Sequence, residues 1–393
     1  MRAAGAQGRG PRAAVPCTQA VILAGGEGTR LRPITSHLPK PVTPLVERPF
    51  VAYILDNLAR HGVERAILST GHLAEKVVDA IGDGRGTGVR VEHVREASPL
   101  GTAGAVANCA AVLRGGPLFA LNGDVLSGVD LSAMVRAHEA SGAMATICLT
   151  RVDDPSRYGV ARLNADRSIK EFVEKPERWS GTALINAGVY LLDREVIDLI
   201  PAGAPRSLER DVFPRLAAAG RLFGWVDTGY WRDIGTPESY LGAHFDVLDG
   251  VAPAGLDGPR RAGIQVSPTA VVVAGARLLS PVHVGAGAMI EANAWVGPHA
   301  VVGAGARIHG GALVRRSVLQ AGSVVGASAQ VESTVLVSDA RIGRGAQVRE
   351  AVLGAGCVVG PGERPPVGVR LHPASAAGEG SYRGAELTGL ASA

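Results

Sequence analysis

The sequence predicts two folded parts: an α/β part built on a doubly wound, mostly parallel sheet, and after it a parallel β-helix. Short apolar runs alternate with segments of helical period over residues 20–249, which is typical of a Rossmann-like sheet covered by helices on both faces. From residue 266 onward, aliphatic residues recur mostly at every sixth position. That period is expected of a β-helix with three short faces in each coil.

The elements of the first part follow from its apolar runs. Between the first two of these runs lies a segment with helical spacing, which Gly62 ends. Buried strands are predicted at residues 20–25, 66–71, 89–94 and 117–124. Sheets of this kind bind ligands beyond the carboxyl ends of their strands, and the loop at 23–41 and the segment at 122–125 lie there.

The second part is a strict repeat in which a step of five replaces the step of six once every seventeen residues. Because one coil cannot bury its own apolar face, the repeat serves first to stack its coils. Such a stack presents a surface for self-association, so we expect a homo-oligomer. Acyl transfer is the alternative, with His283, His299 or His309 as the base. The aliphatic series runs through Val272, Leu278, Val284, Ile290, Val296, Val302, Ile308, Val314, Leu319, Val325, Val331, Leu336, Ile342, Val348, Leu353 and Val359.

Composition excludes several classes of protein. The formal charge of +4 is spread among acids, so nucleic-acid binding is not expected. Four scattered cysteines without ligand spacing indicate neither disulfides nor zinc. No run of eighteen apolar residues occurs, so we expect a cytoplasmic protein without a membrane partner. We expect residues 1–19 and 362–393 to be disordered and 250–265 to be a linker.

The glycine-rich loop "LAGGEGTRLRPITSHLPKP" is the first candidate site. It is not a dinucleotide fingerprint, because G-x-G-x-x-G from Gly26 would need glycine in place of Leu31, and no Gly-Lys-Ser/Thr follows for a Walker A loop. Glycines let backbone N–H groups approach a polyphosphate, and Arg30 and Lys40 add the charge that it requires. An ordinary β–α turn with a salt-bridged arginine is the alternative.

Two further segments favour the binding of a nucleotide phosphate over an ordinary turn. In "PLGTAGAV", Gly101 permits the close approach of a flat ring, while Thr102 can satisfy either the helix start or a ligand. In "ALNGDVL", Asp124 lies just past a strand, and Asp233 precedes a well-marked helix start. Since Mg²⁺ prefers one or two carboxylates plus phosphate oxygens, this pair is a candidate metal site.

A third group suits a polyol phosphate. Tyr158, Gly159, Glu174, Lys175 and Asn186 lie beside strand-like runs. Glutamate and asparagine bind hydroxyl groups, and lysine can neutralise a monophosphate. Each could instead be part of an exposed strand edge.

Taken in order, "LAGGEGTRLRPITSHLPKP", "LGTAGA", "NGDV", "YGV", "EKP", "NAG" and "WRDIGTPE" resemble the sugar-1-phosphate nucleotidyltransferases, and most closely the mannose-1-phosphate guanylyltransferases. The resemblance covers about residues 20–249, and the hexapeptide half is similar to the left-handed β-helix that this family often appends.

The resemblance implies roles for individual residues. Arg30, Lys40, Asp124 and Asp233 would be catalytic, and the two aspartates would bind Mg²⁺. Tyr158, Gly159, Glu174, Lys175 and Asn186 would hold the sugar phosphate. The nucleotide would be held by Leu23, Gly25, Gly26, Gly28, Thr29, Arg30, Gly101, Thr102 and Asp124.

The implied reaction is the attack of a sugar 1-phosphate on the α-phosphorus of an NTP, most simply mannose 1-phosphate on GTP, with release of pyrophosphate. Glucose 1-phosphate, a cyclitol phosphate such as valienol 1-phosphate, and dTTP, UTP or ATP stay open as substrates. So do a bifunctional acyltransferase and an inactive regulatory subunit, although the latter would be expected to lose a carboxylate or the arginine–lysine pair.

Overall fold

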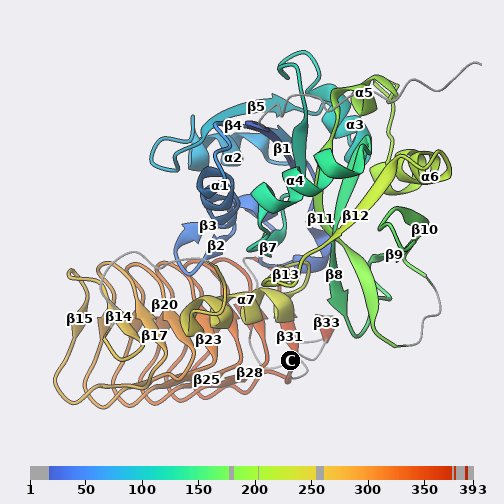
Figure 1. Cartoon of the computed structure of the whole chain (residues 1–393). Helices are drawn as coiled ribbons and strands as arrows, with labels where there is room; N and C mark the ends of the chain where they lie inside the picture. Colours follow the sequence, from blue (N-terminus) through green and yellow to red (C-terminus); the bar gives the residue numbers. More distant parts are fainter. Residues whose placement is uncertain are drawn as a thin grey trace, which may run out of the picture.

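The computed structural model describes residues 17–176, 181–201, 203–253 and 261–373, and two short strands at 376–377 and 386–387. An α/β domain lies above a stack of flat coils, and helix α7 (Pro237–Asp249) lies along the coils (Figure 1). No helix in the described part of the chain is long and apolar enough to cross a membrane. All four cysteines are buried free thiols.

One nine-stranded sheet carries the α/β domain, and its first half is parallel, as the apolar runs predict. In that half β5, β4, β1 and β6 lie side by side. Their bounds are β1 Gln19–Ala24, β4 Arg65–Thr70, β5 Arg90–Arg95 and β6 Leu118–Asn122.

The second half of the sheet is mostly antiparallel. Strand β11 pairs antiparallel with β6, β8 and β9, while β12 pairs parallel with β8. The strand direction of the sheet therefore reverses between β6 and β11. Its strands are β8 Ala145–Val152, β9 Gly159–Leu163, β10 Ile169–Glu174, β11 Ala183–Leu192 and β12 Leu222–Val226.

Helices cover both faces of the sheet, which confirms the doubly wound prediction. Alternate side chains of β1 point to opposite cores: Ile22 belongs to a core that includes residues of α1, α2, α4 and α7, whereas Val21 belongs to a core that includes residues of α3, α5 and α6. The helices are α1 Phe50–Arg60, α2 Ala74–Ile81, α3 Gly101–Asn108, α4 Leu131–Ser141, α5 Arg194–Asp198, α6 Phe213–Ala218 and α7 Pro237–Asp249, with short helical turns η1 Thr29–Leu31, η2 Lys40–Val42 and η3 Leu208–Val212.

Two short ladders and helix α7 lie between the sheet and the coils. Strands β2 Pro44–Leu45 and β3 Arg48–Pro49 form a hairpin before α1. Strands β7 Val125–Ser127 and β13 Trp231–Asp233 pair antiparallel below the sheet. Helix α7 follows β13, and its predicted start is confirmed because the Thr236 hydroxyl accepts the amide of Ser239 at 3.3 Å with Pro237 in the first turn.

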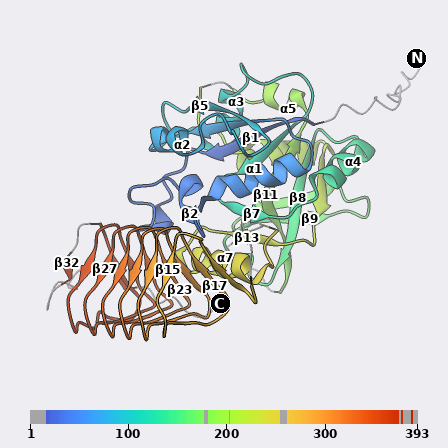
Figure 2. The ribbon, with the colours of Figure 1, turned by 90° about the vertical axis from the view of Figure 1, so that its left-hand side faces the viewer.

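The repeat forms a β-helix with three parallel faces, and Figure 2 shows its coils stacked in register. From Val284 onward every member of the aliphatic series is buried. The first face holds β14 Ile264–Val266, β17 Val282–Val284, β20 Ala300–Val302, β23 Ser317–Leu319, β26 Val335–Leu336, β29 Val352–Leu353, β31 Val369–Leu371 and, antiparallel to β31, β33 Glu386–Leu387.

The second and third faces complete each coil. The second holds β15 Val271–Val272, β18 Met289–Ile290, β21 Arg307–Ile308, β24 Val324–Val325, β27 Arg341–Ile342, β30 Val358–Val359 and β32 Ala376–Ala377. The third holds β16 Arg277–Leu278, β19 Trp295–Val296, β22 Leu313–Arg315, β25 Gln330–Glu332 and β28 Gln347–Arg349.

The five-residue steps mark a tighter corner of the coil. Arg316, Ser333 and Glu350 lie there with positive φ of 48°, 46° and 50°. One residue in the left-handed region turns the chain directly from the third face into the first, so one residue fewer is needed.

The β-helix is longer than its predicted bounds of 266–361. Strand β14 begins at Ile264, within the expected linker, and β31 pairs in parallel with β29 inside the expected disordered tail. The buried core of the β-helix therefore extends to Val369 and Leu371, which are both buried. Residues 1–16 of the expected extension and 254–260 of the linker lie outside the described residues.

Candidate functional site

The site lies where the loops after β1 and β6 meet, at the carboxyl ends of the parallel strands. A cavity of about 360 Å³ opens there. Its walls come from the glycine-rich loop, the start of α3 and the turn after β6: Leu23, Ala24, Gly25, Gly26, Gly28, Lys40, Pro41, Glu96, Pro99, Gly101, Thr102, Ala105, Asn122, Gly123 and Asp124.

Two glycines in this wall are required by the close approach of neighbours. A Cβ on Gly25 would lie 2.4 Å from Oε1 of Glu96. Gly101 has a φ of 68°, and a Cβ there would lie 2.5 Å from the carbonyl oxygen of Arg206. The glycines therefore let the β1 loop and α3 close around the cavity.

A second cavity of about 400 Å³ adjoins the first. Both cavities are lined by Gly101, Thr102, Asn122 and Asp124. The other walls of the second cavity are Arg30, Val125, Arg157, Tyr158, Gly159, Glu174, Lys175, Asn186, Gly188, Ser207, Glu209, Arg210, Trp231 and Asp233. The predicted sugar-phosphate residues thus line the second cavity. The predicted nucleotide residues line the first, except Arg30, which lines only the second, and Thr29.

The two aspartates are brought together by the β7–β13 ladder. Asp233 pairs with Val125, and the amide of Ile234 donates to the carbonyl of Asp124 at 3.0 Å. The Lys40 ammonium lies 2.8 Å from Oδ2 of Asp124. The second cavity also brings Arg30 to the side of Asp233.

The electrostatics of this pair fit a divalent cation. Burial raises the pKa of Asp233, and the negative charge of Asp124 raises it further, while Lys40 and Arg30 oppose the shift. Two partly buried carboxylates that repel each other are stabilised when a dication lies between them. The carboxylates of Asp124 and Asp233 are therefore the residues that could hold one.

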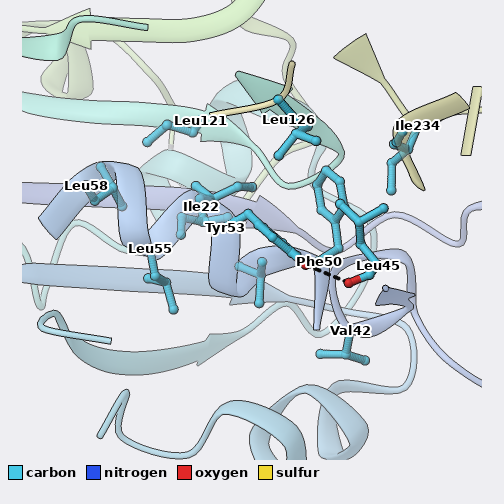
Figure 3. Packing of buried hydrophobic residues seen from close by; sticks show 14 of the residues in the cluster. Ile22, Val42, Leu45, Phe50, Tyr53, Leu55, Leu58, Leu121, Leu126 and Ile234 are labelled. Atoms are coloured by element: carbon cyan, nitrogen blue, oxygen red, sulfur yellow. Dashed lines mark hydrogen bonds between the residues drawn. The ribbon is translucent and has the colours of Figure 1, made fainter. Parts of the chain in front are cut away.

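A shared apolar core fixes the three loops that carry these charges. Figure 3 shows Val42 and Leu45, which follow Lys40, packed with Leu126 and Ile234 around Phe50. All five side chains are buried. Because such cores are close-packed, the positions of the charged groups are set by their apolar neighbours.

On the other side of the second cavity, a hairpin positions the predicted sugar contacts. Gly159 pairs with Glu174 across β9 and β10, and a Cβ on Gly159 would lie 2.7 Å from the Glu174 carboxylate. Lys175 follows with a φ of 50°, its ammonium 3.4 Å from that carboxylate. Asn186 is oriented by the Tyr190 hydroxyl at 2.8 Å and the Gly188 amide at 2.9 Å.

Thr102 and Thr29, two residues of the predicted nucleotide site, do not lie as the sequence suggests. Thr102 lies inside α3 instead of capping it: its hydroxyl donates to Glu209 at 2.6 Å and accepts from the Leu208 amide at 2.8 Å. It therefore joins α3 to η3. Thr29 lines neither cavity and is exposed, and its role in nucleotide binding stays a prediction.

Sequence reasoning missed two carboxylates. Glu96 lies in the first cavity, where Ser69 donates to Oε1 at 2.9 Å and the Leu100 amide to Oε2 at 3.2 Å. Glu209 lies in the second cavity and accepts from Thr102 and, at 2.9 Å, from Tyr190. Glu96 lies five positions before Gly101, close to a segment that the sequence already marks as a candidate site. No local pattern distinguishes Glu209.

The β-helix histidines are engaged by carboxylates. His283 contacts Glu47 at 2.6 Å and His299 contacts Asp249 at 3.0 Å, and both carboxylates belong to the α/β domain or α7. These two histidines therefore join the β-helix to the α/β domain and to α7. His309 contacts Glu291, at 2.9 Å, within the β-helix.

Comparisons with known proteins agree with this architecture. The nucleotidyl transferase family model matches residues 19–250, and the GMPPB C-terminal domain model matches residues 278–363. A mannose-1-phosphate guanylyltransferase of Mycobacterium tuberculosis is 41% identical over 69% of this chain and 76% of its own length. Mannose-1-phosphate guanylyltransferase 1 of Arabidopsis thaliana is 34% identical over 82% and 91%.

A solved structure is similar as well. The crystal structure of HddC from Yersinia pseudotuberculosis complexed with GMP-PN has a TM-score of 0.52 and 31% identity, and it covers 58% of this chain and 99% of that one. The family model spans more than half of the chain and includes both cavities, up to Asp233. The chain therefore belongs to the nucleotidyl transferase family.

Proposed function

We propose that this protein condenses GTP with mannose 1-phosphate to give GDP-mannose and pyrophosphate. The observation that carries the proposal is the pair of adjoining cavities on either side of Asp124. One is walled by the glycine-rich loop, the other by Glu174, Lys175 and Asn186. The names of the relatives that are 41% and 34% identical support both substrates.

The carboxylate of Glu96 supports guanine as the base. It is 8% exposed and lines the first cavity. A carboxylate has about four acceptor positions, so its oxygens keep free lone pairs beside the two donors that already contact them. The Watson–Crick edge of guanine offers N1–H and N2–H₂ donors, whereas the same edge of uracil or thymine offers a single N–H.

The reaction that these groups serve needs no protein nucleophile. An oxygen of the sugar 1-phosphate forms a bond to the α-phosphorus of GTP while the bond from that phosphorus to the bridging oxygen breaks, and pyrophosphate leaves. Lys40, Arg30 and Lys175 supply positive charge along the line of transfer, and alignment accounts for the rest of the rate. Mg²⁺, held by Asp124 and Asp233, would supply further charge neutralisation on the phosphates.

A substrate matrix tests the proposal. Pyrophosphate release is measured for GTP, ATP, UTP and dTTP against mannose, glucose and valienol 1-phosphates. We expect the GTP–mannose 1-phosphate pair to be fastest. Activity confined to UTP or dTTP would refute GTP, preference for glucose or the cyclitol would refute mannose, and silence in every pair would refute the enzyme.

The role of Glu96 has its own variant. Glu96→Gln removes a charge-assisted acceptor worth about 1.5–3 kcal/mol, so kcat/KM for GTP should fall roughly tenfold to a hundredfold. The matched control is Glu75→Gln on α2, whose partner Arg95 is exposed. Equal losses for GTP and UTP in Glu96→Gln would contradict guanine recognition.

The other expectations stay predictions. A cytoplasmic location, a homo-oligomer built on the β-helix and the absence of nucleic-acid partners are tested by fractionation, light scattering and binding assays. Release of free CoA, measured in the same matrix with acetyl-CoA present, tests acyl transfer by the β-helix.

A further inference from the structure

We infer that the β-helix positions the reacting groups through helix α7, and that Gln320 and Arg370 are positioning residues for the reaction. The inference rests on the proposed function, because it takes Lys40 and Asp233 as members of the reacting site. Figure 1 shows α7 lying along the coils, directly below the ladder that ends in Asp233.

Helix α7 holds the Asp233 loop at its first turn. The Ser239 hydroxyl donates to the backbone carbonyl of Asp233, and the Thr236 hydroxyl fixes the same turn by accepting the Ser239 amide. The backbone after Asp233 is thus bonded to the helix that follows it.

The next two turns of α7 hold the Lys40 loop. The Tyr240 hydroxyl donates to the carbonyl of Pro44, and Nδ1 of His244 accepts the amide of Val46 at 3.1 Å. Tyr240 and His244 are both buried and stack edge to face with centroids 4.6 Å apart. One helix therefore fixes the backbone next to Asp233 and the backbone just after Lys40.

The β-helix contacts α7 at these same turns. Nε2 of Gln320, in the coil after β23, donates to the Tyr240 hydroxyl at 3.2 Å, and Gln320 is 5% exposed. Arg370, in β31, lies 3.1 Å from the carboxylate of Glu238 in the first turn of α7. Each contact joins the β-helix to a turn of α7 that holds one of the catalytic loops.

The Tyr240 hydroxyl links the β-helix to the Lys40 loop, because it accepts a hydrogen bond from Gln320 and donates one to the carbonyl of Pro44. Hydrogen bonds in such a chain polarise and strengthen one another. A cavity of about 150 Å³ borders Val46, His244 and Gln320, so these side chains have room to move once a bond is lost. A displacement of about 1 Å in a reacting group can reduce a rate by about a hundredfold.

The test uses the full-length chain with Gln320→Leu, which keeps side-chain volume but removes the donor to Tyr240. We expect kcat for pyrophosphate release to fall roughly tenfold with KM changed less than about threefold, because alignment is lost while substrate contacts remain. Amide hydrogen exchange over residues 40–46 should accelerate roughly fivefold, as expected for a loop that has lost one supporting hydrogen bond.

A double-mutant cycle separates positioning from general destabilisation. Tyr240→Phe removes both bonds at once, so adding Gln320→Leu to it should reduce kcat no further. Additive losses would refute the inference. The matched control is Gln347→Leu on β28, in the third face of the β-helix, which should leave kcat and exchange at residues 40–46 unchanged; an equal loss there would also refute it.

The outcomes distinguish this inference from the proposed function. Wild-type protein that turns over no substrate pair refutes the function. Active wild type with an unchanged Gln320→Leu variant refutes only the positioning role. If Gln320→Leu fails to fold, Arg370→Met carries the same test: its expected loss of kcat is accompanied by faster exchange over residues 233–239, and unchanged kcat and exchange would refute the inference.

Discussion

The sharpest prediction concerns Asp124, the carboxylate that both cavities share. Asp124→Asn keeps the shape of the side chain but removes its charge. The Lys40 ammonium, which lies 2.8 Å from Oδ2 of Asp124, keeps an oxygen to contact. The fold should therefore survive, while the capacity of the site for a dication and its balance of charge should not.

The magnitude follows from electrostatics. One unit charge about 4 Å from the reacting group, at an effective dielectric constant of about 20, contributes at most about 4 kcal/mol. Loss of one preorganised stabilising group typically reduces kcat by about 10² to 10³, or about 2.7–4 kcal/mol. We therefore expect kcat to fall at least a hundredfold, and Asp124→Ala to lose at least as much.

The assay is steady-state pyrophosphate release with circular dichroism as the check on folding. The matched control is Asp130→Asn, in which asparagine can still cap α4 by accepting the Ala133 amide that Asp130 accepts at 2.8 Å. A folded Asp124→Asn protein with kcat within threefold of wild type would refute the reasoning and remove Asp124 from the reacting site.

Three further outcomes concern stability, and urea unfolding measures each. Gly101→Ala places a Cβ on a residue with a φ of 68°, only 2.5 Å from a carbonyl oxygen, so it should lower the free energy of unfolding by about 2 kcal/mol or more. Gly115→Ala, with open space around it, should lower that free energy by less than about 0.5 kcal/mol. Equal losses in the two variants would contradict the strain at Gly101. Leu336→Ala, fully buried in the β-helix, should lose about 2–5 kcal/mol, and a loss below 1 would show that its coil is loosely packed. Burial, and then the charge of His283, lowers the pKa of His244 from 6.5 to about 3, so below pH 6.5 only the unfolded chain takes up this proton and stability should fall by about 1.4 kcal/mol per pH unit towards pH 3. His244→Asn should lack this component, and identical slopes between pH 6.5 and 5 would contradict it.

Local patterns determined much of this protein. The spacing of Val284, Ile290 and Val296 specified the faces of the β-helix, because a coil can bury an aliphatic side chain only at that period. The start of α7 followed from Thr236 and Pro237, whose hydrogen-bonding and backbone preferences act over a single turn. The alternation of short strands and helices likewise determined the parallel half of the sheet.

The ends of the β-helix were not predictable in the same way. After Val359 the hexad spacing lapses, so the sequence placed the boundary at residue 361, yet Val369 and Leu371 complete another strand. Whether a segment forms a further coil depends on the apolar surface that the preceding coil leaves uncovered. That surface is a property of the stack and not of the local sequence.

Only the tertiary structure decided how the site is assembled. The sequence supplied Asp124 and Asp233 as separate carboxylates, but the β7–β13 ladder brings them together in the fold, where burial, and then the charge of Asp124, raises the pKa of Asp233. Glu96 and Gln320 have no periodic signature, because their roles arise from a cavity wall and from a hydrogen bond between domains. Periodicity and turn chemistry act between near neighbours in the chain, whereas charge repulsion, cavities and interdomain contacts depend on distance in space, which only the folded chain defines.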